Sequence, residues 1–207
     1  KEIVFYDKNG NDLGVKYFHP SGELNSFAPK DYGFTHGKFN NYDAFGELVI
    51  HRDYNGGECL SYSYLKDGKL IDPIFINGNG VVKSFYNNGK VASEYVERDG
   101  LYEGPYKRYF SNGKPWIETT YLHDNIHGNY KSYFSDGKLR YEAKYDFGRL
   151  NGVQKKYNHH GNILSEITFN QGIKDGTSKF YNDNGNLMYI LLYKDDIVVK
   201  IDRPFEY

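Results

Sequence analysis

Histidines are the first candidates for chemistry, because imidazole nitrogens bind transition metals and transfer protons near neutral pH. His123 and His127 lie four residues apart, a spacing that places two ligands on one face of a helix. Their neighbours are instead typical of a strand end and a turn, and a zinc site needs further convergent ligands. His159 and His160 occupy a position that other segments fill with Ser-Asn or Ser-Asp, so we expect exposed turn residues. The sequence predicts no metal site.

Carboxylates, the thiol and short glycine clusters give no better case for catalysis. Asp195 and Asp196 are adjacent, but hydrolytic enzymes need two carboxyl groups that converge across a cleft in different environments. Cys59 is the only cysteine, and without a context that would activate it we expect a small buried residue. The glycine clusters at 56–57 and 78–80 are too short for a phosphate-binding loop, so we expect turns. We predict no catalytic residue, no cofactor and no enzyme activity.

The most regular charged residues are a lysine series and a glutamate series. Lysine recurs at positions 83, 107, 131, 155 and 179, and glutamate at 94, 118, 142 and 166, with Ile190 ending the second series. These residues could form a charged binding stripe, but pairing across strands on a solvated sheet face is the simpler interpretation. Lys and Arg number 26 against 27 Asp and Glu, so no charge surplus favours nucleic acid or acidic lipid, and we predict no nucleic-acid binding.

The strands and turns that must position these charges are marked by glycines. Three turn positions recur with a period of 24 residues. The first series is Gly89, Gly113, Gly137, Gly161 and Gly185; the second is Gly80, Gly104, Gly128, Gly152 and Gly176; the third is Gly100, Asp124, Gly148, Gly172 and Asp196. Strand-forming aromatic and β-branched residues lie between them. A period of this length indicates a repeat array in which each unit packs on its neighbours.

The first glycine series predicts hairpin tips. Asn or Asp precedes most of these glycines, which favours two-residue type I′ turns. Such a tip at 112–113 fixes the register, so Lys107 should face Glu118 and Tyr109 should face Trp116. The same rule pairs Lys83 with Glu94, Lys131 with Glu142, and Lys155 with Glu166.

Two aromatic columns accompany the glycines. One lies four residues before each tip glycine: Tyr6, Phe18, Tyr42, Tyr64, Phe85, Tyr109, Tyr133, Tyr157 and Tyr181. The other, Tyr121, Tyr145, Phe169 and Tyr193, should lie on the opposite face, where we expect packing between hairpins rather than a ligand platform. Spacing before Gly89 is irregular, so we predict degenerate hairpins over 1–79 and regular ones over 80–207, continuous as one elongated domain.

The segments GPYKRYFSNGK, at 104–114, and GNYKSYFSDGK, at 128–138, resemble the bacterial variant of the MORN repeat, the MORN_2 type. The resemblance covers residues 80–199 well and 1–79 weakly. It implies an all-β fold of consecutive antiparallel β-hairpins that form an elongated, twisted single-layer sheet. It further implies a scaffold or interaction module, with membrane lipids discussed for eukaryotic members and an antitoxin-like label for some bacterial ones.

These observations favour a non-enzymatic scaffold that binds a protein partner through an extended tyrosine-rich surface. The candidate surface residues are Tyr109, Trp116, Tyr133, Tyr157, Lys107 and Lys131. Association with a membrane surface or lipid headgroup is one alternative, against which the net charge of −1 counts; antitoxin-like neutralisation of a partner and a catalytic unit elsewhere in a longer product are others. The partner, the oligomeric state and the compartment, exported after loss of a leader or cytoplasmic, stay open.

Overall fold

The computed structural model describes residues 1–203; residues 204–207, the end of the predicted regular segment, lie outside that part. Every regular element in the described part is a β-strand, and every pairing shown is antiparallel. No described helix is long and apolar enough to cross a bilayer. The chain is divided into two compact units. The first consists of residues 1–103 with 111–113, and the second of residues 104–110 with the described residues from 114 onward.

The first unit contains one complete sheet, the separate β8–β9 hairpin, and β11 and β12, which are the first two strands of a second sheet. The sheet has the strand order β1-β2-β3-β5-β6-β7-β10, with β4 on β3, while β8 pairs with β9 and β11 with β12. The strands are β1 (Glu2–Tyr6), β2 (Asp12–Phe18), β3 (Leu24–Asp31), β4 (Phe34–Thr35), β5 (Gly37–Tyr42), β6 (Leu48–Asn55), β7 (Glu58–Ser63), β8 (Leu65–Lys66), β9 (Lys69–Leu70), β10 (Ile74–Phe75), β11 (Gly80–Phe85) and β12 (Val91–Arg98).

The core of the first unit lies where this sheet contacts the β11–β12 hairpin. Ile50, Cys59, Val82 and Tyr95 are at most 2% exposed. The buried Arg52 guanidinium on β6 donates through Nε to the Tyr95 hydroxyl on β12 at 2.7 Å. Cys59 is the buried small residue that the sequence predicted, and burial raises the pKa of its thiol to about 12. This unit therefore has a packed interior between two layers of strands.

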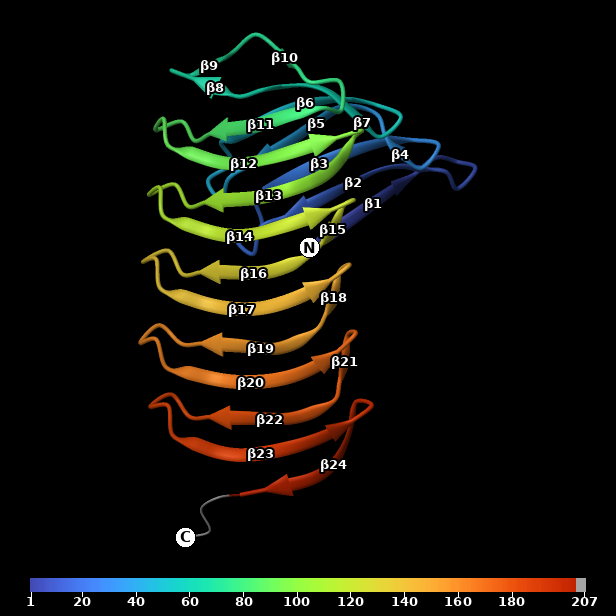
Figure 1. Cartoon of the computed structure of the whole chain (residues 1–207). Helices are drawn as coiled ribbons and strands as arrows, with labels where there is room; N and C mark the ends of the chain where they lie inside the picture. Colours follow the sequence, from blue (N-terminus) through green and yellow to red (C-terminus); the bar gives the residue numbers. More distant parts are fainter. Residues whose placement is uncertain (204–207) are drawn as a thin grey trace. The chain divides into compact units, whose positions relative to one another are not determined.

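The second unit repeats one pattern of long and short strands (Figure 1). Its strands are β13 (Leu101–Tyr109), whose first three residues belong to the first unit, β14 (Pro115–Leu122), β15 (Asn125–Ile126), β16 (Gly128–Tyr133), β17 (Leu139–Asp146), β18 (Arg149–Leu150), β19 (Gly152–Tyr157), β20 (Ile163–Asn170), β21 (Ile173–Lys174), β22 (Gly176–Tyr181), β23 (Leu187–Lys194) and β24 (Ile197–Asp202). Each of β14, β17 and β20 turns back into a two-residue strand, and a glycine then bends the chain into the next long strand.

The tips are real turns, but they are not type I′. Asn112 and its equivalents keep a negative φ, and only the glycine is positive, at +85° for Gly113. Phe110 N donates to Lys114 O at 2.8 Å, which closes a three-residue loop of the type I plus bulge class. A type I′ turn needs two residues with positive φ, whereas this loop needs one, which glycine supplies without steric cost.

The third turn series has the two successive positive φ angles that a type I′ turn requires. Positive φ at two successive residues marks Asp99-Gly100, His123-Asp124, Phe147-Gly148, Gln171-Gly172 and Asp195-Asp196. In Figure 1 the last four of these turns lie at the edge of the second unit opposite to its tips. Asn-Gly and Asp-Gly pairs therefore led the sequence interpretation to the correct turn positions but to the wrong turn class.

The predicted register is right for the charged pairs and wrong nearer the tip. Lys107 lies opposite Glu118, and the pairs predicted for Lys83, Lys131 and Lys155 are also present. Tyr109 lies opposite Pro115 and not opposite Trp116, because the bulge shifts the register between Arg108 and Tyr109. The all-β fold of consecutive antiparallel hairpins is confirmed; the continuity of 1–79 and 80–207 as one domain stays a prediction.

Candidate interaction surface

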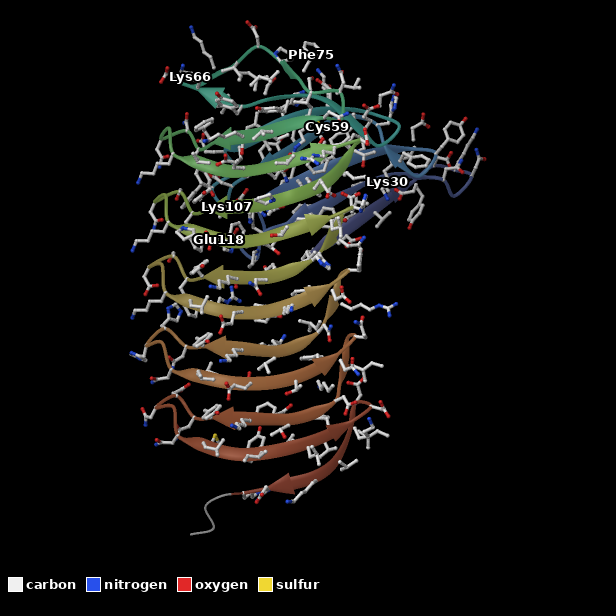
Figure 2. The ribbon with its side chains drawn as sticks, in the orientation of Figure 1. Lys30, Cys59, Lys66, Phe75, Lys107 and Glu118 are labelled. Carbon is white, nitrogen blue, oxygen red and sulfur yellow. The ribbon has the colours of Figure 1, made fainter. Side chains whose placement is uncertain are left out.

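A row of alternating charge crosses the second unit. Successive strands place Lys107, Glu118, Lys131, Glu142, Lys155, Glu166 and Lys179 directly opposite one another. In the first three hairpins of the second unit the lysine therefore faces a glutamate of its own hairpin, and that glutamate also faces the lysine of the next one. In the fourth hairpin Lys179 faces Ile190. Figure 2 labels the first pair, Lys107 on β13 and Glu118 on β14. We call these seven residues the charged row.

Three glutamates alternate with four lysines along the row, so its net charge is small, and its contacts are moderate. Lys155 Nζ lies 3.5 Å from Glu166 Oε1, with the two side chains 34% and 23% exposed. Partly exposed pairs of this kind contribute about 0.2–1 kcal/mol each. The row therefore stabilises the pairing of strands on this face, which is the interpretation that the sequence favoured.

Tyrosines tie each glutamate of the row to the next hairpin. The hydroxyl of Tyr133 donates to Glu118 Oε2 at 2.6 Å, and the hydroxyl of Tyr157 donates to Glu142 Oε1 at 2.7 Å. Tyr181 does the same for Glu166 at 2.8 Å. The tip aromatic column therefore lies on the same face as the charged row and holds consecutive hairpins together.

These phenols are neutral donors near neutral pH. Burial, reinforced by the hydrogen bond to the Glu118 carboxylate, raises the pKa of Tyr133 to about 12. Burial and the Glu166 carboxylate raise the pKa of Tyr181 to about 12 as well. A phenolate beside a carboxylate would bring two negative charges together, so the proton stays on the tyrosine.

The opposite face of the second unit carries aromatic rings, and small side chains are buried between them. The Tyr106 ring contacts Tyr121 at 5.3 Å, and Tyr130 contacts Tyr145 at 5.9 Å. These ring contacts join the two strands of one hairpin, whereas Gln154 Nε2 crosses to the previous hairpin and donates to the Tyr141 hydroxyl at 2.8 Å. Small side chains are buried on this face: Thr119, Ser132, Ala143, Ser165 and Ser178.

The six residues named from the sequence do not form a single cluster. Lys107 and Lys131 are exposed members of the charged row, and the Tyr133 and Tyr157 rings are half-buried beside its glutamates. Tyr109 occupies the equivalent half-buried position one hairpin earlier. The structure thus brings five of them to the charged row and the tip column next to it.

Trp116 lies apart from the hydrogen-bonded tyrosines, at the tip of the first hairpin. Phe110 stacks on its ring at 5.6 Å, and the Arg108 guanidinium lies 4.3 Å from the ring centroid. The sequence missed the hydrogen bond from tyrosine to glutamate. The constant separation of 15 residues between the two columns, from Glu118 to Tyr133 and from Glu142 to Tyr157, was the available signal.

Metal chemistry finds no geometric support in residues 1–203, where no three or more His, Cys, Asp or Glu side chains are arranged to hold an ion. His123 lies in a type I′ turn with φ of 49°. His127 Nδ1 lies 3.4 Å from Asp146 Oδ1, and its ring contacts Phe147. His159 and His160 are exposed in their tip, with the His159 ring stacked on Phe134 at 3.8 Å. These histidines serve packing and turns.

Comparison with known proteins gives one family. The MORN repeat variant family matches residues 79–96, 102–123, 126–146, 150–171 and 174–195, together just over half of the chain. No curated protein matches this chain. Two solved structures, described as TcdB2-TccC3-Cdc42 and TcdB2-TccC3, are similar at 13% and 12% identity over 95% and 93% of this chain, each with a TM-score of 0.18. The chain spans 14% of the length of each, and at this TM-score they carry no argument.

Proposed function

This chain belongs to the MORN repeat variant family, whose members are generally scaffolds, and on that premise we propose that it is a non-enzymatic scaffold that binds a protein partner. The binding surface is the face of the second unit that carries the charged row with Tyr109, Tyr133 and Tyr157. One observation carries the proposal: on this face hydroxyls and ammonium groups recur at fixed register over four hairpins, and carboxylates over the first three of them.

The physical case rests on rigidity and on mixed chemistry. The tyrosine rings are held by hydrogen bonds to the glutamates, so a partner would order few side chains on binding, which lowers the entropic cost of association. Tyrosine offers a large ring together with a polar end, which suits protein interfaces. Alternating charge favours a partner with its own alternating side chains over a uniformly acidic surface.

A matched pair of lysine variants tests this surface. Lys131 belongs to the charged row, whereas Lys156 is exposed on the other face, next to Lys155 in sequence. The partner is identified by cross-linking in extracts and then measured with purified proteins. Lys131→Ala should weaken its affinity severalfold, and Lys156→Ala should leave the affinity unchanged. Equal losses in both variants would contradict binding through the charged row.

Vesicles separate this proposal from lipid association. The purified chain should not co-sediment with vesicles rich in phosphatidylserine, because three glutamates alternate with the four lysines of the row and leave little net positive charge. Binding that disappears at high salt and in Lys131→Ala would instead assign the surface to anionic headgroups and overturn the protein-scaffold proposal.

A further inference from the structure

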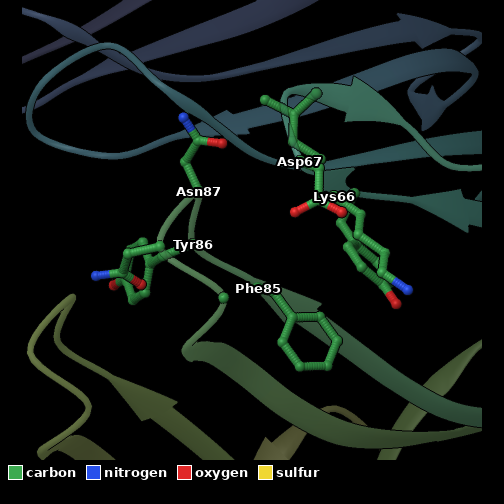
Figure 3. Close-up of a pocket in the computed structure, with 9 residues that line it drawn as sticks. Lys66, Asp67, Phe85, Tyr86 and Asn87 are labelled. Atoms are coloured by element: carbon green, nitrogen blue, oxygen red, sulfur yellow. The ribbon is translucent and has the colours of Figure 1, made fainter.

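A pocket of about 490 Å³ opens in the first unit, which holds no residue of the charged row. One wall is the short β8–β9 hairpin, which contributes Tyr64 and residues 65–67. The other wall is the tip that joins β11 to β12, at residues 85–89. The rings of Tyr64 and Phe85 meet across it at 4.7 Å, and Figure 3 shows the side chains around it.

Lysines of this chain show what the space beside a tip can hold. Lys90 follows one tip and lays its stem over the glycine of the next, with Cδ 3.2 Å from where a Cβ of Gly113 would stand. Its ammonium donates to the carbonyl of Asn112 at 2.8 Å. Lys114 repeats both contacts one hairpin on, over Gly137 and onto the carbonyl of Asp136.

Two further tips receive comparable donors. Lys138 Nζ donates to the carbonyl of His159 at 2.7 Å. Asn162 Nδ2 donates to the carbonyl of Asp183 at 2.9 Å. Each of these four tips therefore presents a backbone carbonyl that accepts a nitrogen donor from the tip before it.

The tip at residues 86–90 lacks this arrangement. Within residues 1–203, only Gly89 itself and its chain neighbours lie within 4 Å of a Cβ built on Gly89. The side chains of Asn87 and Asn88 donate to Glu47 Oε2 and Ser111 O, and no side-chain donor of the described residues reaches their carbonyls. The cause lies in the preceding hairpin. Asp67 and Gly68 form a type I′ turn, which sets Lys69 directly opposite Lys66 across β8 and β9 instead of over the next tip. We infer that the pocket corresponds to the space that a lysine stem takes at the tips of Gly113 and Gly137.

The walls of the pocket suit a cation on an apolar stem. Tyr64, Phe85 and Tyr86 supply rings whose faces attract cations. Asp67 turns its carboxylate toward the space between the walls in Figure 3. Glu47 adds a second carboxylate next to the tip, where it accepts from Asn87 Nδ2 at 3.3 Å. Lys66 also lines the pocket and opposes this charge.

We propose that the pocket between the β8–β9 hairpin and the tip at residues 86–90 binds an alkylammonium group, seated as Lys90 and Lys114 are seated on the following tips. Its stem lies along the rings and over Gly89, and its ammonium donates to the tip carbonyls and to Asp67. The source is a lysine side chain of a partner or a free diamine. This site does not depend on the charged row.

Titration of the isotope-labelled chain followed by amide NMR tests the site. The probes are 1,5-diaminopentane and a capped peptide with one central lysine, and the controls are 1-pentanol and the same peptide with norleucine. We expect saturable shifts at the amides of Asn87, Asn88 and Gly89 with a Kd of about millimolar for the diamine, and none with the controls. Tighter binding of the peptide would assign a partner's lysine; tighter binding of the diamine would assign a free amine.

Two variants and one control test how the charges of Asp67 and Lys66 change the affinity for the amine. Asp67→Asn should weaken binding about threefold or more, because it removes the carboxylate while asparagine tolerates the same positive φ. Asp99→Asn, the same change in another Asp-Gly type I′ turn away from the pocket, should have no effect. Lys66→Met should strengthen binding about twofold, because it removes a like charge.

Failure of the site would be unambiguous. Shifts that 1-pentanol reproduces, shifts that spread equally over the later tips, or no saturable shift at the three amides would overturn the proposal. Equal affinity in Asp67→Asn and the unaltered chain would do the same. None of these results bears on partner binding through the charged row, which Lys131→Ala tests separately.

Discussion

Both units bury small polar side chains, but among the described residues only the first unit also buries large apolar and aromatic ones. Nine of the ten buried hydrophobic residues in the described part lie in the first unit, and Ala143 is the exception. In the second unit the other buried side chains are Thr119, Ser132, Ser165 and Ser178, which lie on its aromatic face. One unit is held by packing between two layers, the other by contacts between neighbouring strands, so a local change should spread further in the first.

Removal of Tyr95 should produce the largest effect. Tyr95→Ala leaves a cavity in the core and deprives the buried Arg52 guanidinium of its hydroxyl partner, so we expect a loss of about 3–5 kcal/mol in the unfolding free energy of the first unit. Tyr157→Ala is the matched change in the second unit, where the half-buried ring should cost about 1–2 kcal/mol. Denaturant unfolding with hydrogen exchange measures both, and equal losses would refute the contrast between the units.

Substitution of a tip glycine should cost less, because the damage is confined to one loop. Gly137→Val forces a β-branched residue to a φ of +91° and against Lys114 Cδ at 3.2 Å, for about 1–3 kcal/mol in the unfolding free energy of the second unit. Gly137→Asn, which tolerates this φ, should retain more of the stability. The loop assignment would be wrong if valine and asparagine gave the same urea midpoint.

Reversal of one charge tests how much the alternation of charge in the row contributes to stability. Glu142→Lys would put three lysines in succession with Lys131 and Lys155, and it would remove the acceptor of the Tyr157 hydroxyl. We expect about 1 kcal/mol less unfolding free energy at low salt, and a smaller loss at high salt. Glu142→Gln keeps an acceptor and should lie between the two; a loss independent of salt would exclude electrostatics as its cause.

Alkaline pH should reveal the smallest effect. The pKa values of Tyr133 and Tyr181 are raised to about 12 from an unfolded value near 10. Their protons are therefore held more tightly in the folded state, and this contribution to stability is complete below about pH 10 and declines between about pH 10 and 12. Phenolate absorbance should show late titration that diminishes in Tyr133→Phe. Unchanged late titration in that variant would place the shifted phenol elsewhere.

Local spacing was enough to predict much of the second unit. The glycine period and the Lys and Glu columns predicted which residues lie opposite each other, because side chains alternate with a period of two and a turn fixes where the count begins. The pairing of Tyr109 failed because a bulge lies between this residue and Arg108. The sequence held no direct sign of that bulge, since Asn-Gly suits both turn classes.

The candidate surface was predictable only in part. Lys107, Lys131 and the tip tyrosines were named from their columns, but the bond from Tyr133 to Glu118 joins residues whose approach depends on how one hairpin pairs with the next. Trp116 was placed with them by a register that the bulge alters, and its ring lies instead with Phe110 and Arg108.

The sequence by itself determined the family, the hairpin repeat and the opposition of Lys to Glu, because these follow from turn chemistry and from alternation along a strand. Only the tertiary structure decided that Arg52 reaches Tyr95 across 43 residues and that a pocket opens beside Gly89. Contacts between layers depend on where an irregular chain turns back. No period along the sequence encodes that position.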